Sequence, residues 1–188
     1  MSAIHEHVLQ NGMTLLCWPQ RHLHGLEFGL YLKGGPLYET EETQGISNLL
    51  EHLCFRGLGG LNREGLLREL NRFGTNLDAA TYAEGLVFRL KCLPRFFDAA
   101  LEYFLRFFAN VAWTPEQIAA EKQVVLRQLE ADGDGDLFDR AACDFRKTEN
   151  GAFPPLGTPE SLMALTEADI QLWQEMIFQP QNACLVMT

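Results

Sequence analysis

The spacing of the apolar residues switches between a period of two and a helical period along this chain. Residues 26–32 and 85–92 alternate apolar and polar side chains, which predicts strands that are covered on one face. Residues 43–55 instead place Ile46, Leu49 and Leu53 three and four positions apart, which predicts an amphipathic helix. The order is strands, helices, strands, helices and a last strand. This order predicts an α+β fold, a largely antiparallel sheet of about five to six strands with helices packed on it.

The remaining elements follow from turn and capping residues. Asn11-Gly12 separates the strand patterns 8–10 and 13–18, which predicts a hairpin with a tight turn. Asn62, Thr114 and Thr166 each stand at the N-cap of a helical pattern. Further strands are expected at 75–82 and 182–188, and further helices at 62–73, 94–109, 114–131, 137–146 and 166–178.

Composition limits the classes of function. With 47% hydrophobic and 21% charged residues, the chain of 188 residues can bury a core, and we expect one domain over residues 1–188. The 15 Lys and Arg against 25 Asp and Glu give a net charge of −10. Because phosphate binding needs a basic surface, this charge argues against nucleic acid and against an anionic membrane as partners.

Targeting signals and redox motifs are missing from the sequence. The first residues have neither a basic segment nor an apolar run, and no run approaches the roughly 18 apolar residues of a membrane span. The five cysteines form no Cys-x-x-Cys pair. We therefore expect a cytoplasmic location.

A polar stripe interrupts the apolar helix pattern at 43–55. Asn48, Glu51 and His52 stand at i, i+3 and i+4, so they share one helix face. The stripe could simply face solvent. However, the helix is otherwise suited to burial, and buried polar groups cost free energy unless they are paired. A stripe of this kind is therefore more expected at a functional site than in a plain core.

Asn48-x-x-Glu51-His52 stands where the inverzincin metallopeptidases have His-x-x-Glu-His, and further motifs follow in the same order. The chain resembles this family, the pitrilysin and insulinase relatives that include the mitochondrial processing peptidase. The similar segments are 11–13, 35–39, 45–57, 78–88, 121–128 and 157–161, which together extend over essentially the whole chain.

The resemblance implies roles for individual positions. Glu51 takes the place of the general base and His52 that of one zinc ligand. Asn48 and Gln128 take the places of the other His and Glu ligands, so two of three ligand positions carry a neutral carboxamide. Carboxamide oxygens are weak zinc ligands. Glu121, about 10 Å along a helix from Gln128, cannot take over its position.

Further positions matter for the substrate. Asp78, Ala79, Ala80 and Thr81 match the family's strand that pairs with the peptide backbone, while Glu121 and Glu84 are expected to flank the site. Asp78 replaces the family's Asn, which would favour a basic peptide.

The sequence therefore predicts a domain of the metallopeptidase family that is non-catalytic, without cofactor, although active relatives hold zinc. It would bind peptide and pair with an active homologous subunit, or form a homo-oligomer. Two other functions stay open, an active zinc metalloendopeptidase with unusual ligands and a purely structural subunit. At the site, Asn48 and Gln128 could hydrogen-bond Glu51 and His52, or these last two residues could retain a weakly bound metal. The family's subunits carry two such domains, so we expect the N-terminal part of a longer subunit.

Overall fold

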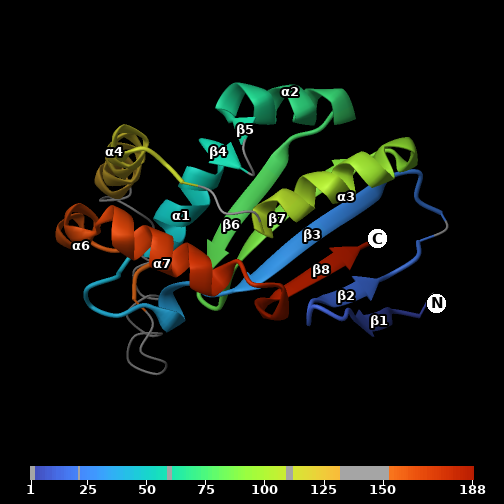
Figure 1. Ribbon diagram of the computed structural model, residues 1–188, viewed down its shortest axis with the longest axis horizontal. Helices are drawn as coiled ribbons and strands as arrows, with labels where there is room; N and C mark the ends of the chain where they lie inside the picture. Colours follow the sequence, from blue (N-terminus) through green and yellow to red (C-terminus); the bar gives the residue numbers. More distant parts are fainter. Residues whose placement is uncertain (1–2, 21, 59–60, 109–111, 132–152) are drawn as a thin grey trace.

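Six strands form one mixed sheet in the computed structural model, which describes residues 3–20, 22–58, 61–108, 112–131 and 153–188 (Figure 1). The strand order is β1-β2-β8-β3-β7-β6. Neighbouring strands are antiparallel except for β2 and β8, which are parallel. The strands are β1 (His5–Val8), β2 (Thr14–Cys17), β3 (Leu26–Lys33), β6 (Leu77–Tyr82), β7 (Gly85–Cys92) and β8 (Ala183–Met187). The predicted α+β class and the largely antiparallel sheet are confirmed.

Helices cover one face of this sheet (Figure 1). One helix, α3, packs on β3 and β7, while α1 lies on β6 and is flanked by α4 and α7. The helices are α1 (Ile46–Cys54), α2 (Arg63–Phe73), α3 (Phe97–Leu105), α4 (Pro115–Ala131), α6 (Pro159–Ala164) and α7 (Glu167–Ile177). The predicted helix 137–146 lies outside the described residues. None of the described helices is both long and apolar enough to cross a membrane.

The core follows the period of two that the sequence shows. Leu30 on β3 lies opposite Phe88 on β7 and Leu185 on β8, and all three side chains are buried under the helices. The next residue, Tyr31, points to the other face and is 41% exposed. One face of the sheet is therefore covered, and the other is open.

The N-terminal hairpin differs from its prediction. The strands are joined by residues 9–13 rather than by a two-residue turn. A tight Asn-Gly turn needs positive φ at both residues, but only Gly12 has it, with φ 87°. Instead, the Asn11 side chain accepts a hydrogen bond from the Met13 amide. A second ribbon, β4 (Gly57–Leu58) with β5 (Leu61–Asn62), was not predicted.

A buried carboxylate and a buried hydroxyl fix the start of α1. Glu39 accepts hydrogen bonds from the amides of Gly45 (2.8 Å) and Ser47 (3.0 Å). Burial raises the pKa of Glu39, and the hydrogen bonds from Gly45 and Ser47 oppose this rise. The hydroxyl of Ser47 accepts from the Gly35 amide and from Trp173 Nε1 on α7, each at 3.1 Å. These contacts hold the helix that carries the polar stripe.

Two glycines let another segment approach the same helix end. Gly45 has φ 83°, and a Cβ added there would lie 2.6 Å from the carbonyl oxygen of Leu156. Gly157 has φ 68°, and its added Cβ would lie 2.5 Å from the carbonyl oxygen of Gln44. Residues 44–45 and 156–157 therefore meet backbone against backbone, which only glycine permits.

Candidate functional site

The polar stripe of α1 faces other elements rather than bulk solvent. It lies where α1 contacts β6 and α4. Glu51 is only 9% exposed, and the side chain of His52 is 19% exposed. The interpretation of the stripe as a solvated helix face is therefore wrong.

Glu51 is held by the edge strand β6. The hydroxyl of Thr81 donates a hydrogen bond to Glu51 Oε2 at 2.5 Å. Burial raises the pKa of Glu51, while the hydrogen bond from Thr81 and the charge of His52 act in the opposite direction. The carboxyl thus takes up a proton more readily than an exposed glutamate.

His52 is held by α4. Its Nδ1 lies 3.4 Å from Glu121 Oε2, and Arg56 Nε donates to the other carboxylate oxygen of Glu121. Burial of Glu121 would raise its pKa, but its bonds with His52 and Arg56 hold this pKa below the ordinary value. Glu121 therefore bridges an imidazole and a guanidinium as a carboxylate.

The carboxamides of Asn48 and Gln128 make no hydrogen bond with Glu51 or His52 among the described residues. Asn48 Oδ1 is buried and has no hydrogen-bond partner. Gln128 is exposed on α4. Within the described residues neither side chain hydrogen-bonds to Glu51 or His52, whose partners are Thr81 and Glu121 instead. The alternative that Asn48 and Gln128 hydrogen-bond Glu51 and His52 is therefore wrong for the described structure, in which Glu51 and His52 instead have partners on β6 and α4.

This donor set does not fit a catalytic zinc ion. Such an ion needs three strong protein donors and an open position. Within the described ranges, no three His, Cys, Asp or Glu side chains gather in a way that could hold a metal ion. The oxygen of Asn48 is buried, and both oxygens of Glu121 are engaged by His52 and Arg56.

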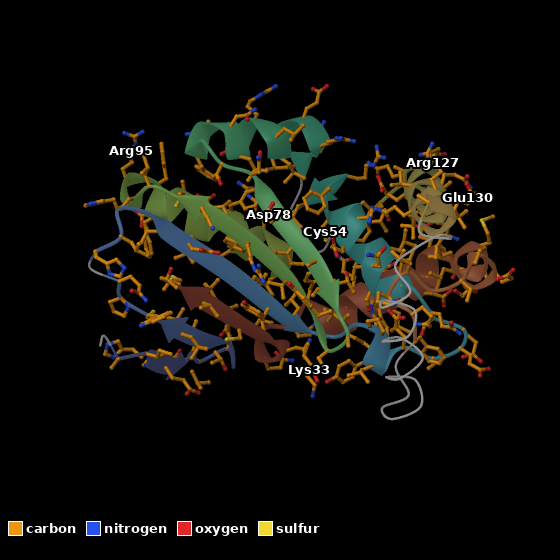
Figure 2. All side chains as sticks on the ribbon, turned by 180° about the vertical axis from the view of Figure 1, so that it is seen from behind. Lys33, Cys54, Asp78, Arg95, Arg127 and Glu130 are labelled. Atoms are coloured by element: carbon orange, nitrogen blue, oxygen red, sulfur yellow. The ribbon has the colours of Figure 1, made fainter. Side chains whose placement is uncertain are left out.

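The strand β6 runs along the edge of the sheet beside Glu51. Among the strands that the structure describes it pairs with β7 alone, so no described strand occupies its other side. Ala79 and Thr81 face the helices, while Asp78 and Ala80 lie on the open face (Figure 2 labels Asp78). Glu84 lies in the exposed turn after β6, where its carbonyl oxygen accepts from the Gly34 amide. Among the described residues, Glu84 has no contact with Glu51 or His52 that is an ion pair or hydrogen bond.

A cavity of about 410 Å³ lies beside His52 and is lined by residues of α1, α2, α3 and α4 and by the first residue of β6. Its wall includes Arg56 and Arg63, which the sequence did not mark as site residues. Arg56 lies in the similar segment 45–57 but was given no role, and Arg63 lies outside all the similar segments. Only the folded arrangement of α1 and α2 brings the two side chains to one cavity. A larger cavity of about 620 Å³, near Arg95 (labelled in Figure 2), contains none of the predicted site residues.

Comparison with known proteins agrees with the fold and the motifs. The model of the family described as insulinase, peptidase family M16, matches residues 24–142. An uncharacterized zinc protease of Rickettsia felis is 28% identical over 162 residues, which are 85% of this chain and 39% of that protein. The β subunit of the mitochondrial processing peptidase of Caenorhabditis elegans is 27% identical over 146 residues, 76% of this chain and 32% of its own.

Solved structures share the fold. A protease from Helicobacter pylori superimposes with a TM-score of 0.88 at 21% identity, covering 99% of this chain and 46% of that one. An inactive M16 peptidase domain from Pseudomonas fluorescens gives 0.86 at 16% identity, covering 98% and 46%. The chain thus spans less than half the length of these relatives. The matched family model, the ordered motifs and the fold together show that the chain belongs to the insulinase family of peptidases, M16.

Proposed function

We propose that this chain is a non-catalytic M16 domain that binds an extended peptide and works with an active homologous subunit. One observation carries the proposal: the three positions that would hold zinc offer one imidazole, one buried carboxamide oxygen and one exposed carboxamide. The retained Glu51 and His52 are bonded to Thr81 and Glu121.

The loss of the metal would remove the chemistry but not the shape of the site. A zinc ion lowers the pKa of a bound water to about 7 and polarises a carbonyl group. Glu51 cannot supply either effect, and its raised pKa makes it a carboxyl group that protonates easily. The edge strand β6 beside Glu51 contains neither of the substituted ligand positions, Asn48 and Gln128.

Strand addition is the mode of peptide binding that the geometry supports. A peptide that pairs with the free edge of β6 gains main-chain hydrogen bonds, and its side chains alternate between the two faces of the sheet. The side chains on one face would meet the cavity beside His52, and those on the other would meet Asp78.

Pairing with another subunit rests on the relatives. The chain matches a protein named as a subunit of a processing peptidase, and it spans less than half of that relative's length. We propose that an active homologue supplies catalysis and that this domain contributes peptide-binding surface. Assembly of identical chains is the alternative.

Restoring the ligands tests the catalytic part of the proposal. The double variant Asn48→His, Gln128→Glu should bind zinc stoichiometrically, whereas the wild type should not; metal analysis after dialysis measures both. The triple variant that also carries His52→Ala is the control and should lose the metal again. Stoichiometric zinc in the wild type, together with chelator-sensitive cleavage of a quenched peptide, would contradict the proposal.

Peptide binding is tested separately. The anisotropy of a labelled extended peptide should rise on addition of the wild-type chain, alone or with an intact homologous subunit. No rise in either case would instead favour a purely structural subunit.

A further inference from the structure

The cavity beside His52 combines an apolar floor with a charged rim. Leu66 and Leu70 on α2, Leu77 on β6 and Tyr103 on α3 line it, and each of these side chains is at most 8% exposed. A volume of about 410 Å³ lies within the range of ligand pockets. The floor therefore suits one large apolar side chain.

The charges of the rim do not cancel. Arg56, Arg63 and Glu121 all line the cavity. Both oxygens of Glu121 are occupied, one by Arg56 and the other by His52. Within the part of the chain that the structure describes, no carboxylate lies within 4 Å of the Arg63 guanidinium. One guanidinium group thus remains available to a ligand, in a chain whose net charge is −10.

Helix stability does not explain Arg63. It is the first residue of α2, where the helix dipole favours an acidic side chain and disfavours a cation. One N-terminal amide of α2, that of Gly65, already has a side-chain partner, since it donates to Asn62 Oδ1 at 2.9 Å. Arg63 therefore stands against the local electrostatics of its own helix, at the rim of an apolar cavity.

We infer that this cavity binds an apolar residue that carries a carboxylate next to it, which Arg63 recognises. The carboxylate can come from the C-terminus of a peptide or from an acidic side chain. This inference rests on the proposed peptide binding. Leu77 belongs to both β6 and the cavity wall, so a peptide paired with β6 would pass directly over the opening.

Matched peptides test the inference. Short extended peptides ending in leucine would be made as the free acid and as the amide, and their Kd values measured by fluorescence anisotropy. Because Arg63 is exposed, we expect the free acid to bind about two- to fivefold tighter at low salt. The difference should shrink at high salt. An amidated peptide with glutamate beside the terminal leucine distinguishes the two sources of the carboxylate. If it binds as tightly as the free acid, a side-chain carboxylate can take the place of the terminal one; if it binds only as weakly as the plain amide, the terminal carboxylate alone is recognised.

Variants assign the effect to one residue. Arg63→Gln should make the acid and the amide bind equally, whereas Arg68→Gln, an equal change of charge at another exposed position of α2, should keep the preference. An equal Kd for all three peptides in the wild type, or a preference that survives Arg63→Gln, would overturn the inference. If no peptide binds at all, it is the proposed peptide binding that fails.

Discussion

Ser47 joins three segments through one hydroxyl group. Its oxygen accepts from the Gly35 amide before the first short helical turn and from Trp173 Nε1 on α7. All of these groups are buried, so each donor would lose its partner without access to water.

Removing this hydroxyl should therefore cost more than an ordinary surface change. We expect Ser47→Ala to lower the free energy of unfolding by about 1–3 kcal/mol in urea denaturation. Trp173→Phe deletes one of the two donors, so the double variant should be less destabilised than the sum of the single variants. Additive effects would show that the Ser47–Trp173 bond contributes nothing.

Glu121 should add an acid-sensitive component to stability. Its folded-state pKa is lowered by His52 and Arg56, so the unfolded chain binds the proton more readily. The contribution is complete above the unfolded pKa of about 4.3 and is lost as the pH falls through the folded pKa. Glu121→Gln should lower stability at neutral pH by about 1 kcal/mol and flatten the loss of stability on acidification.

The control is Glu69→Gln, which removes the half-buried partner of the exposed Arg72 on α2. It should change stability by less than about 0.5 kcal/mol and leave the pH dependence as it is. A wild-type and a Glu121→Gln curve that stay parallel between neutral and acidic pH would contradict the role of this carboxylate.

At the scale of single residues, the sequence predicted the stripe but not its partners. Asn48, Glu51 and His52 share a helix face by spacing alone. The contacts of Glu51 with Thr81 and of His52 with Glu121 cross 30 and 69 positions of sequence, and no local pattern encodes them. Glu84 was expected to flank the site, but it lies in the exposed turn after β6. Its position in a motif does not determine the direction in which its side chain points.

At the scale of elements, two glycines have nearly the same positive φ but differ in the space around them. Comparing them distinguishes the cost of backbone strain from the cost of a steric clash. Gly74 after α2 has φ 66°, and a Cβ there would have nothing within 4 Å. Gly157 before α6 has φ 68°, but its Cβ would lie 2.5 Å from the carbonyl oxygen of Gln44.

The alanine variants should therefore differ. Gly74→Ala should cost about 1–2 kcal/mol, the strain of a left-handed residue alone. Gly157→Ala should cost a further 1–3 kcal/mol or so, because the backbone at the start of α1 must move. Thermal unfolding of both variants measures the difference. Equal losses of stability in the two variants would mean that the backbones at Gln44 and Gly157 can move apart without a cost in free energy.

Helix starts were predictable where capping side chains mark them. Thr166 and Asn62 cap α7 and α2 as expected, and both accept a hydrogen bond from the third helical amide. The ribbon of β4 and β5 was missed because each strand has two residues, too short to show a period. The hairpin turn was mispredicted because Asn11 bonds the Met13 amide rather than adopting a positive φ.

At the scale of the whole molecule, the sequence predicted the class but not the strand order. Alternation identifies the covered face of β3 and β7. It carries no information on the insertion of β8 between β2 and β3, which joins the two ends of the chain in one sheet. That arrangement leaves β1 at an edge with all four of its residues exposed.

Hydrogen exchange should show a difference in local stability between the edge strand β1 and the central strand β3. The amides of β3, which has a partner strand on both sides, should exchange only on global unfolding, and those of β1 by local opening at much lower cost. Mass spectrometry of peptic fragments measures both. Equal protection of β1 and β3 would show that the hairpin and the core open as one unit.

The position of β8 also determines when the sheet can be completed during synthesis on the ribosome. The hairpin of β1 and β2 is made before β3 and β8, and among the described strands it is joined to β3 through β8 alone. β1 and β2 therefore remain without their partner strand until residues 183–187 have been made, and a two-stranded hairpin alone is only marginally stable in water. During that interval the nascent chain displays unpaired strand edges, the kind of surface that chaperones exist to shield.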